Sequence, residues 1–350
     1  KVLLTCFFVA FFASLYSQSC YWVVFADKNG TDFDPYSYFD EKAIQRYNAM
    51  GADLYHISNY PLNHTYVNQV SDLVLEVIGE SRWFNALAVE ASESQMDAVR
   101  KLPFVSYVKI ISRTDMQLAQ QSYEDDDQQL IVDLLVNDES NELYDDQLMR
   151  MQGNLFGDNG YDGTGIRIAV FDSGFPSVDT HLAFEHLRSG KQIISTWNFP
   201  EKKADVYGWG SHGTNTLSCI AGVAGGKKLG LATGAEYLLA RTEVNLEPFK
   251  EEIWWMQAVE WADKHGANII SSSLGYREPL SSPQLGACCC VTCGSALVGP
   301  SVSDVVVLSA ASVAPSFGVS LGTFPPCEEG RGVFSFLSLA TSATRIFSST

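Results

Sequence analysis

Hydrophobic and polar residues follow four successive patterns along this 350-residue chain. Residues 2–13 form an uncharged apolar run, and residues 20–111 alternate between short apolar stretches and amphipathic ones. A polar, acidic tract follows over 115–146, and short apolar runs alternate again with helical periods from about residue 163. Because strands that alternate with helices are typical of α/β folds, the pattern predicts two α/β units joined by a linker.

The first apolar run predicts a secretory signal peptide over residues 1–19. Lys1 supplies the positive charge at its start, and three serines after the run are small residues suited to cleavage. A membrane anchor is the alternative, because the next charged residue is Asp27, but the run is short for a bilayer span. We therefore expect a secreted protein, extracellular or periplasmic, without stable membrane association. The chain begins with Lys, which suggests that the sequence is incomplete at its start.

The capping patterns and apolar runs of residues 20–112 predict a small domain of strands and helices. A capping pattern at Ser37–Asp40 indicates a helix that runs through Met50, and Ser92 with Gln95 indicates a second helix. The expected strands are Tyr21–Phe25, Val74–Ile78, Trp83–Val89 and Val105–Ile111.

The stretch Gly165–Gly174 predicts a buried strand that ends in an acid. Its apolar residues are bounded by glycines, as in strands of a parallel sheet, and Asp172 stands where the strand ends. Ligands and catalytic groups gather at the carboxyl ends of such strands. His212 stands between small residues just before a predicted helix over Thr214–Gly222. One nitrogen of such an imidazole can face a nucleophile while the other donates to an aspartate, so we expect Asp172 and His212 within hydrogen-bond reach.

Other roles are open to each of these residues separately. A strand ending in Asp-x-Gly occurs in many α/β folds, and His212 alone could be a structural histidine or a metal ligand. A metal site needs clustered His, Cys or carboxylate partners, whereas the neighbours of His212 are Gly, Ser and Thr. A calcium loop at Asp125–Asp127 lacks the alternating ligands and the glycine. We therefore expect no metal site and no cofactor.

Three motifs in order carry a family resemblance. Asp172-Ser173-Gly174, His212-Gly213-Thr214 and Ser273-Leu274-Gly275 resemble those of the subtilases, the peptidase S8 family of serine endopeptidases. The resemblance implies hydrolysis of a polypeptide substrate by an Asp-His-Ser triad, in which Asp172 orients the imidazole and His212 is the general acid and base. It also implies that Ser273, Leu274 and Gly275 pair with extended substrate.

The same resemblance implies the fold and the domains. We expect an α/β fold with a parallel, doubly wound subtilisin-like sheet, incomplete here, over residues 151–280. A small α+β domain over 20–112 would be the inhibitory propeptide, and so a partner of the catalytic unit. We expect residues 20–111 to bind the face that bears Asp172.

The charge of the chain argues against nucleic acid as a partner, and its distribution predicts a linker. The formal net charge of −18 argues against nucleic acid, because phosphate binding needs clustered Lys and Arg. Eleven acidic residues and no Lys or Arg lie between Asp115 and Met149, which predicts an acidic linker over residues 113–150.

Residues 281–350 depart from the subtilase pattern. Only five of these seventy residues are charged, the last asparagine of the chain is Asn268, and the only Gly-Thr of this tail precedes Phe324 rather than a serine. The nucleophilic serine and the oxyanion-hole asparagine of the family therefore have no match here. A shifted reading frame, an unrelated join and a true truncation all remain open, as does an apolar membrane-seeking tail that Pro300 and Pro315 interrupt. A non-catalytic peptide-binding or inhibitory module is thus the alternative to a protease.

Limited proteolysis tests the linker. Because a polar, strongly acidic tract cannot bury enough apolar surface to fold, a protease should cut the chain first between Asp115 and Asp146. Mass spectrometry of the earliest fragments checks this, and protection of the tract would contradict the linker assignment.

Overall fold

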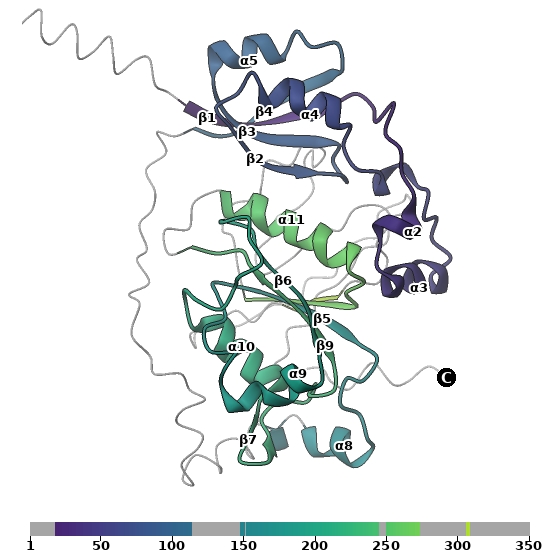
Figure 1. The fold of residues 1–350 in the computed structure, drawn as a ribbon, viewed down its shortest axis with the longest axis vertical. Helices are drawn as coiled ribbons and strands as arrows, with labels where there is room; N and C mark the ends of the chain where they lie inside the picture. The colour runs from purple at the N-terminus through teal and green to yellow at the C-terminus, as the bar shows by residue number, and fades with distance from the viewer. Residues whose placement is uncertain (1–17, 114–147, 151, 245–249, 274–305, 309–350) are drawn as a thin grey trace, which may run out of the picture.

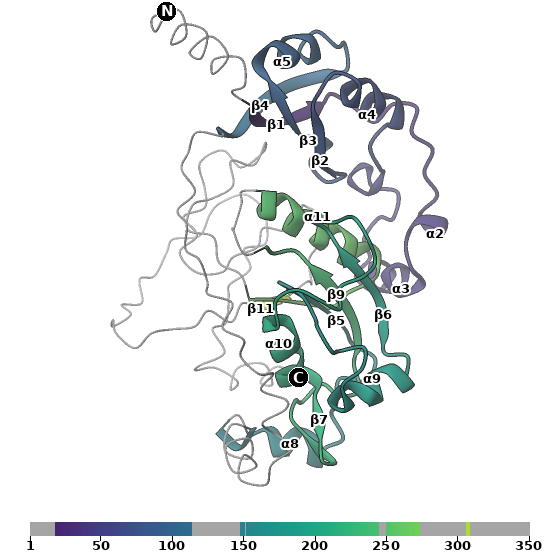
Figure 2. The ribbon, with the colours of Figure 1, turned by 60° about the vertical axis from the view of Figure 1, so that its left-hand side comes forward.

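The computed structural model describes residues 18–113, 148–150, 152–244, 250–273 and 306–308. Nearly all of the predicted signal peptide, and most of the acidic linker and of the 281–350 tail, lie outside these residues. Two sheets are stacked with helix α11 (Lys250–Lys264) between them, as Figures 1 and 2 show.

The N-terminal sheet is antiparallel, with strand order β2-β3-β1-β4. Its strands are β1 (Gln18–Phe25), β2 (Glu76–Ser81), β3 (Ala86–Ser92) and β4 (Val105–Arg113). Helices α4 (His64–Ser71) and α5 (Glu93–Val99) cover its outer face, where Val70 and Met96 join the apolar side chains of the strands. The four strands with α4 and α5 follow one another as β-α-β-β-α-β, and these two helices lie on the same side of the sheet (Figure 1).

Several local predictions for this unit are confirmed and others are wrong. The capping box of Ser92 and Gln95 is present at the start of α5. The capping box expected at Ser37–Asp40 is absent, because Pro35 begins a separate short helix, α2 (Pro35–Tyr38), and α3 (Glu41–Ala49) starts only after Asp40. The second and third strands begin two and three residues later than expected. Helix α4, whose start the Asn63 side chain caps, was not predicted from the sequence.

The second sheet is parallel, with strand order β11-β10-β5-β9-β6, which confirms the predicted α/β class. Its strands are β5 (Arg167–Asp172), β6 (Ile193–Asn198), β9 (Glu236–Arg241), β10 (Ile269–Ser272) and β11 (Val306–Leu308). Strands β6, β9 and β11, the last within the 281–350 tail, were not predicted from the sequence. Shorter elements complete the described chain: η1 (Ile57–Asn59), α8 (Gly153–Asp158), η3 (Leu182–Phe184), α9 (Glu185–Ser189), β7 (Val223–Ala224) and β8 (Lys227–Lys228).

Alternate residues of β5 face opposite sides of the parallel sheet. Ile168 and Val170 pack with α9 and with α10 (His212–Ala221), whereas Ala169 and Phe171 pack with α11. Asp172 continues the series that faces α10. The N-terminal sheet packs on α11 and therefore on the other side, so the expected docking on the face that bears Asp172 is wrong (Figure 1).

Helix α11 is covered on two sides at once. Ala258, Val259 and Ala262 pack on the parallel sheet, and Ile253 and Met256 pack on the inner face of the N-terminal sheet. None of its fifteen residues is exposed. A helix that packs on a sheet on each of two sides belongs to the interior of a protein, so the two sheets share one element of their cores.

Buried charges join the two units near the end of α11. Asp263, 1% exposed, forms ion pairs with Arg82 and Arg46 and accepts a hydrogen bond from the Tyr47 hydroxyl at 3.2 Å. Glu260, one turn earlier, accepts the backbone N–H of Arg82 at 2.9 Å. Both carboxylates are buried, and the hydrogen-bond donors and cations of the N-terminal unit offset the free-energy cost of that burial.

Replacement of Asp263 by Asn should destabilise the chain. The change leaves the Arg46 and Arg82 guanidinium groups buried without this carboxylate, and breaking a buried pair in this way costs about 3–5 kcal/mol. Asp97→Asn is the matched control, because its ion pair with Arg100 is largely exposed and should contribute less than about 1 kcal/mol. Urea unfolding followed by tryptophan fluorescence compares them, and equal midpoints would contradict the prediction.

Candidate active site

Asp172 is the last residue of β5, at the carboxyl edge of the parallel sheet, and is fully buried. The chain then turns at Gly174, whose φ of +151° lies in a region that disfavours side chains. A Cβ atom there would lie 2.1 Å from the carbonyl oxygen of Gly208. The turn after Asp172 therefore requires glycine, because the 208–210 segment packs directly against it.

His212 is the first residue of α10, which begins two residues before the predicted helix. A Cβ atom on the next residue, Gly213, would lie 2.3 Å from the Gly174 carbonyl oxygen and 2.8 Å from the Asp172 Cβ. The glycine after the histidine therefore allows the start of α10 to approach the end of β5. This close approach brings residues 40 positions apart into contact.

The imidazole of His212 lies against the carboxylate of Asp172. Its Nδ1 is 2.9 Å from Oδ1 and 3.0 Å from Oδ2 of Asp172. The His212 side chain is 62% exposed, whereas that of Asp172 is fully buried. The hydrogen bond to Asp172 raises the pKa of His212 above 6.5, while burial opposes the rise. When Nδ1 holds the proton and donates to the carboxylate, the lone pair is left on Nε2.

Further donors surround the carboxylate. Oδ1 accepts the Ser173 backbone N–H at 2.7 Å and the Ser173 hydroxyl at 3.3 Å. Oδ2 accepts the Thr216 hydroxyl at 3.2 Å. A buried polar group needs such partners, because its hydrogen bonds to water are lost on burial. The sequence analysis did not single out Thr216, although its position four residues after His212 places it on the same face of a helix.

The other predicted site residues are only partly described. Ser273 follows β10, and the register pairs the preceding Ser272 with Phe171, so Ser273 lies at the same carboxyl edge as Asp172. Leu274 and Gly275 lie outside the described residues. The structure brings Asp172 and His212 together as expected, while the catalytic and substrate-binding roles of all five residues stay predictions.

Asn268 does not lie near the imidazole. Its side-chain oxygen accepts the backbone N–H of Arg167 at 2.9 Å, at the amino end of β5, whereas Asp172 ends that strand. In the described part of the chain, no serine hydroxyl is hydrogen-bonded to His212. The described residues thus supply an acid and a base, without a nucleophile paired to them.

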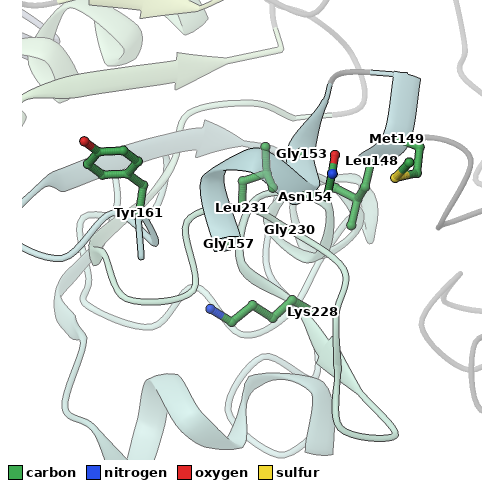
Figure 3. Close-up of a pocket in the computed structure, with 9 residues that line it drawn as sticks. All are labelled: Leu148, Met149, Gly153, Asn154, Gly157, Tyr161, Lys228, Gly230 and Leu231. Carbon is green, nitrogen blue, oxygen red and sulfur yellow. The ribbon is translucent and has the colours of Figure 1, made fainter. Parts of the chain in front are cut away.

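A cavity of about 410 Å³ lies elsewhere on the parallel-sheet unit (Figure 3). Its walls come from α8 and from the chain around β8: Leu148, Met149, Gly153, Asn154, Gly157, Tyr161, Lys228, Gly230 and Leu231. Neither Asp172 nor His212 lines it. The cavity is therefore separate from the Asp172–His212 pair.

The described ranges contain no group of three or more His, Cys, Asp or Glu side chains placed to hold a metal ion. No helix within them has the length and apolar character needed to cross a bilayer.

Solved structures of two proteases align with this chain. The epidermin leader peptide processing serine protease (EpiP) of Staphylococcus aureus aligns with a TM-score of 0.41 and 13% identity, over 74% of this chain and 50% of that chain. Fervidolysin of Fervidobacterium pennivorans, a keratinolytic enzyme related to subtilisin, aligns with a TM-score of 0.40 and 16% identity, over 73% of this chain and 35% of that chain. The chain thus spans half or less of the length of these proteins.

Comparison with known protein families gives two matches. Residues 20–128 match the peptidase S8 propeptide domain of Bacteroidota, and residues 163–302 match the subtilase family. The second match includes Asp172, His212 and Ser273, and it extends past Leu280, where we expected the resemblance to stop. Residues 163–302 are therefore similar to the subtilase family, and residues 20–128 before them are similar to the peptidase S8 propeptide domain.

Proposed function

We propose that this chain carries the propeptide and the Asp–His half of the triad of a secreted, subtilisin-like serine endopeptidase. The observation that supports this most directly is the 2.9 Å contact between His212 Nδ1 and Asp172 Oδ1 at the carboxyl edge of a parallel sheet. In this proposal the protein hydrolyses peptide bonds in polypeptides, and residues 1–19 direct its secretion. The 113–150 linker is the site of maturation cleavage.

The mechanism assigns one role to each residue. The neutral His212 Nε2 takes the proton of a serine hydroxyl as that oxygen attacks the peptide carbonyl, and later returns it to the leaving amine. Asp172 holds the proton on Nδ1 and stabilises the imidazolium that forms. Ser273 and the two residues after it follow β10 and would pair with the extended substrate through their backbone. The serine itself is not assigned.

The propeptide would act from the side of the parallel sheet opposite to α10. Its inner face shares the apolar contacts of α11, and Arg82 and Arg46 pair with Asp263 of that helix. Such contacts support a role in folding and in holding the catalytic unit before cleavage. The catalytic unit would extend over residues 151–280 and the propeptide over 20–112.

The alternative function is a non-catalytic peptide-binding or inhibitory module. It is favoured by the absence from the tail of a serine in the Gly-Thr-Ser context and of any asparagine after Asn268. The nucleotide sequence beyond the codon for Leu280, read in all three frames, distinguishes the two. A Gly-Thr-Ser in another frame supports the protease.

The polypeptide of these 350 residues should hydrolyse peptides no faster than its His212→Ala variant. His212 can only activate a nucleophile that is placed beside it, and no serine here has the sequence context that the family uses. A serine-directed fluorophosphonate probe gives the measurement. Labelling that disappears in His212→Ala would contradict the prediction, because it would mean that a serine outside that context reaches the imidazole.

The titration of His212 should depend on Asp172. Because the hydrogen bond to Asp172 raises the pKa of His212, its NMR titration midpoint should lie above pH 6.5 and should fall in Asp172→Asn. The stabilisation from this pair is then fully present below pH 6.5 and is lost as pH rises through the raised pKa. His186 is an internal control, because burial lowers its pKa and it should not respond to Asp172→Asn. An unchanged His212 midpoint in that variant would count against the pair.

A further inference from the structure

We propose that the Thr216 hydroxyl is a positioning group that fixes the Asp172 carboxylate, and through it the tautomer and orientation of the His212 imidazole. The inference rests on the proposed function, since it assigns a role within the same site. It is nevertheless tested on the imidazole itself, without any need for turnover.

Helix α10 contacts the carboxylate at two points. His212 and Thr216 are four residues apart, so their side chains lie on one face of the helix, one turn from each other. The imidazole Nδ1 reaches both carboxylate oxygens, and the Thr216 hydroxyl donates to Oδ2 at 3.2 Å. A rotation of the carboxylate about its Cβ–Cγ bond would therefore break contacts to both residues of the helix.

The donors are divided between the two oxygens. The Ser173 backbone N–H and hydroxyl donate to Oδ1, on the strand side, while the Thr216 hydroxyl donates to Oδ2, on the helix side. Because Asp172 is fully buried, each carboxylate oxygen needs a hydrogen-bond donor from the protein to offset the cost of its burial. Without Thr216, Oδ2 would keep the imidazole contact alone among the donors in the described residues.

A threonine in mid-helix usually has a different hydrogen bond. Its hydroxyl commonly donates to the backbone carbonyl four residues earlier, which leaves it without influence on a neighbouring strand. Two other hydroxyls of α10 do bond to backbone, since Ser218 donates to the Asn215 carbonyl at 2.7 Å and Thr214 to the Pro176 carbonyl at 2.7 Å. The Thr216 hydroxyl is instead directed to the carboxylate that orients the imidazole.

The experiment compares Thr216→Val, Thr216→Ser and Ser218→Ala in the full chain. Valine keeps the shape of threonine and removes the hydroxyl, and serine restores the hydroxyl. Ser218→Ala removes a hydroxyl of the same helix that bonds to the Asn215 carbonyl and to the Cys219 side chain rather than to Asp172. Nitrogen-15 NMR of the His212 ring reports its tautomer, and the Nδ1 proton reports the hydrogen bond to Asp172. Amide spectra of each variant report folding.

In the unchanged chain the neutral ring should carry its proton on Nδ1. In Thr216→Val the Nδ1-protonated fraction should fall and the Nδ1 proton should exchange with water at least about threefold faster, as expected when about 0.7 kcal/mol of hydrogen bonding is lost. Thr216→Ser and Ser218→Ala should both match the unchanged chain. If Thr216→Val does not fold, Thr216→Ser still tests the proposal. Loss of the His212 Nδ1 proton signal in the serine variant, which keeps the hydroxyl, would overturn it.

Three other results would overturn the proposal. An unaltered ring signal in Thr216→Val would show that the hydroxyl does not position the pair, and would leave the proposed function intact. An equal change in Ser218→Ala would assign the effect to the helix as a whole. A neutral His212 without its proton on Nδ1 in the unchanged chain would contradict the proposed function as well.

Discussion

The shared burial of α11 is the constraint on which the rest of the structure depends. One side of this helix completes the core of the parallel sheet, and another completes the inner face of the N-terminal sheet. Neither sheet can therefore lose the helix without exposing apolar surface. Because Asp263 and Glu260 are also buried where the units meet, the charges must pair across the boundary, which fixes the register of one unit on the other.

This arrangement separates the contact of the N-terminal unit from the Asp172–His212 pair. Asp172 faces α10, whereas α11 and the N-terminal sheet lie on the other side of the parallel sheet. A contact on the side of the parallel sheet opposite to α10 can stabilise the arrangement of the strands, and hence the position of their carboxyl edge, without touching the imidazole. The N-terminal unit would thus support the site through the sheet that carries it.

The site itself depends on how closely two backbone segments approach. Gly174 and Gly213 allow the turn after β5 and the start of α10 to lie against each other, at distances that a Cβ atom would not permit. The approach leaves one partner of the pair buried and the other largely exposed. A buried carboxylate behind an exposed imidazole suits the proposed general base, because the ring faces solvent while the carboxylate fixes its orientation from within.

Local sequence determined much of this protein. A short apolar run predicted β5, Ser92 with Gln95 predicted the start of α5, and the glycines near Asp172 and His212 marked the two ends that meet. These features depend on neighbouring residues, so periodicity and capping chemistry were sufficient to find them.

Only the tertiary structure decided that the N-terminal unit covers the α11 side of the parallel sheet. This contact requires apolar residues on two sides of α11, one for each sheet. The tertiary structure also decided that Thr216 donates to Asp172 and that Asp263 pairs with Arg82. Each of these contacts joins residues far apart in the chain, and their sequence positions carry no record of the fold that brings them together.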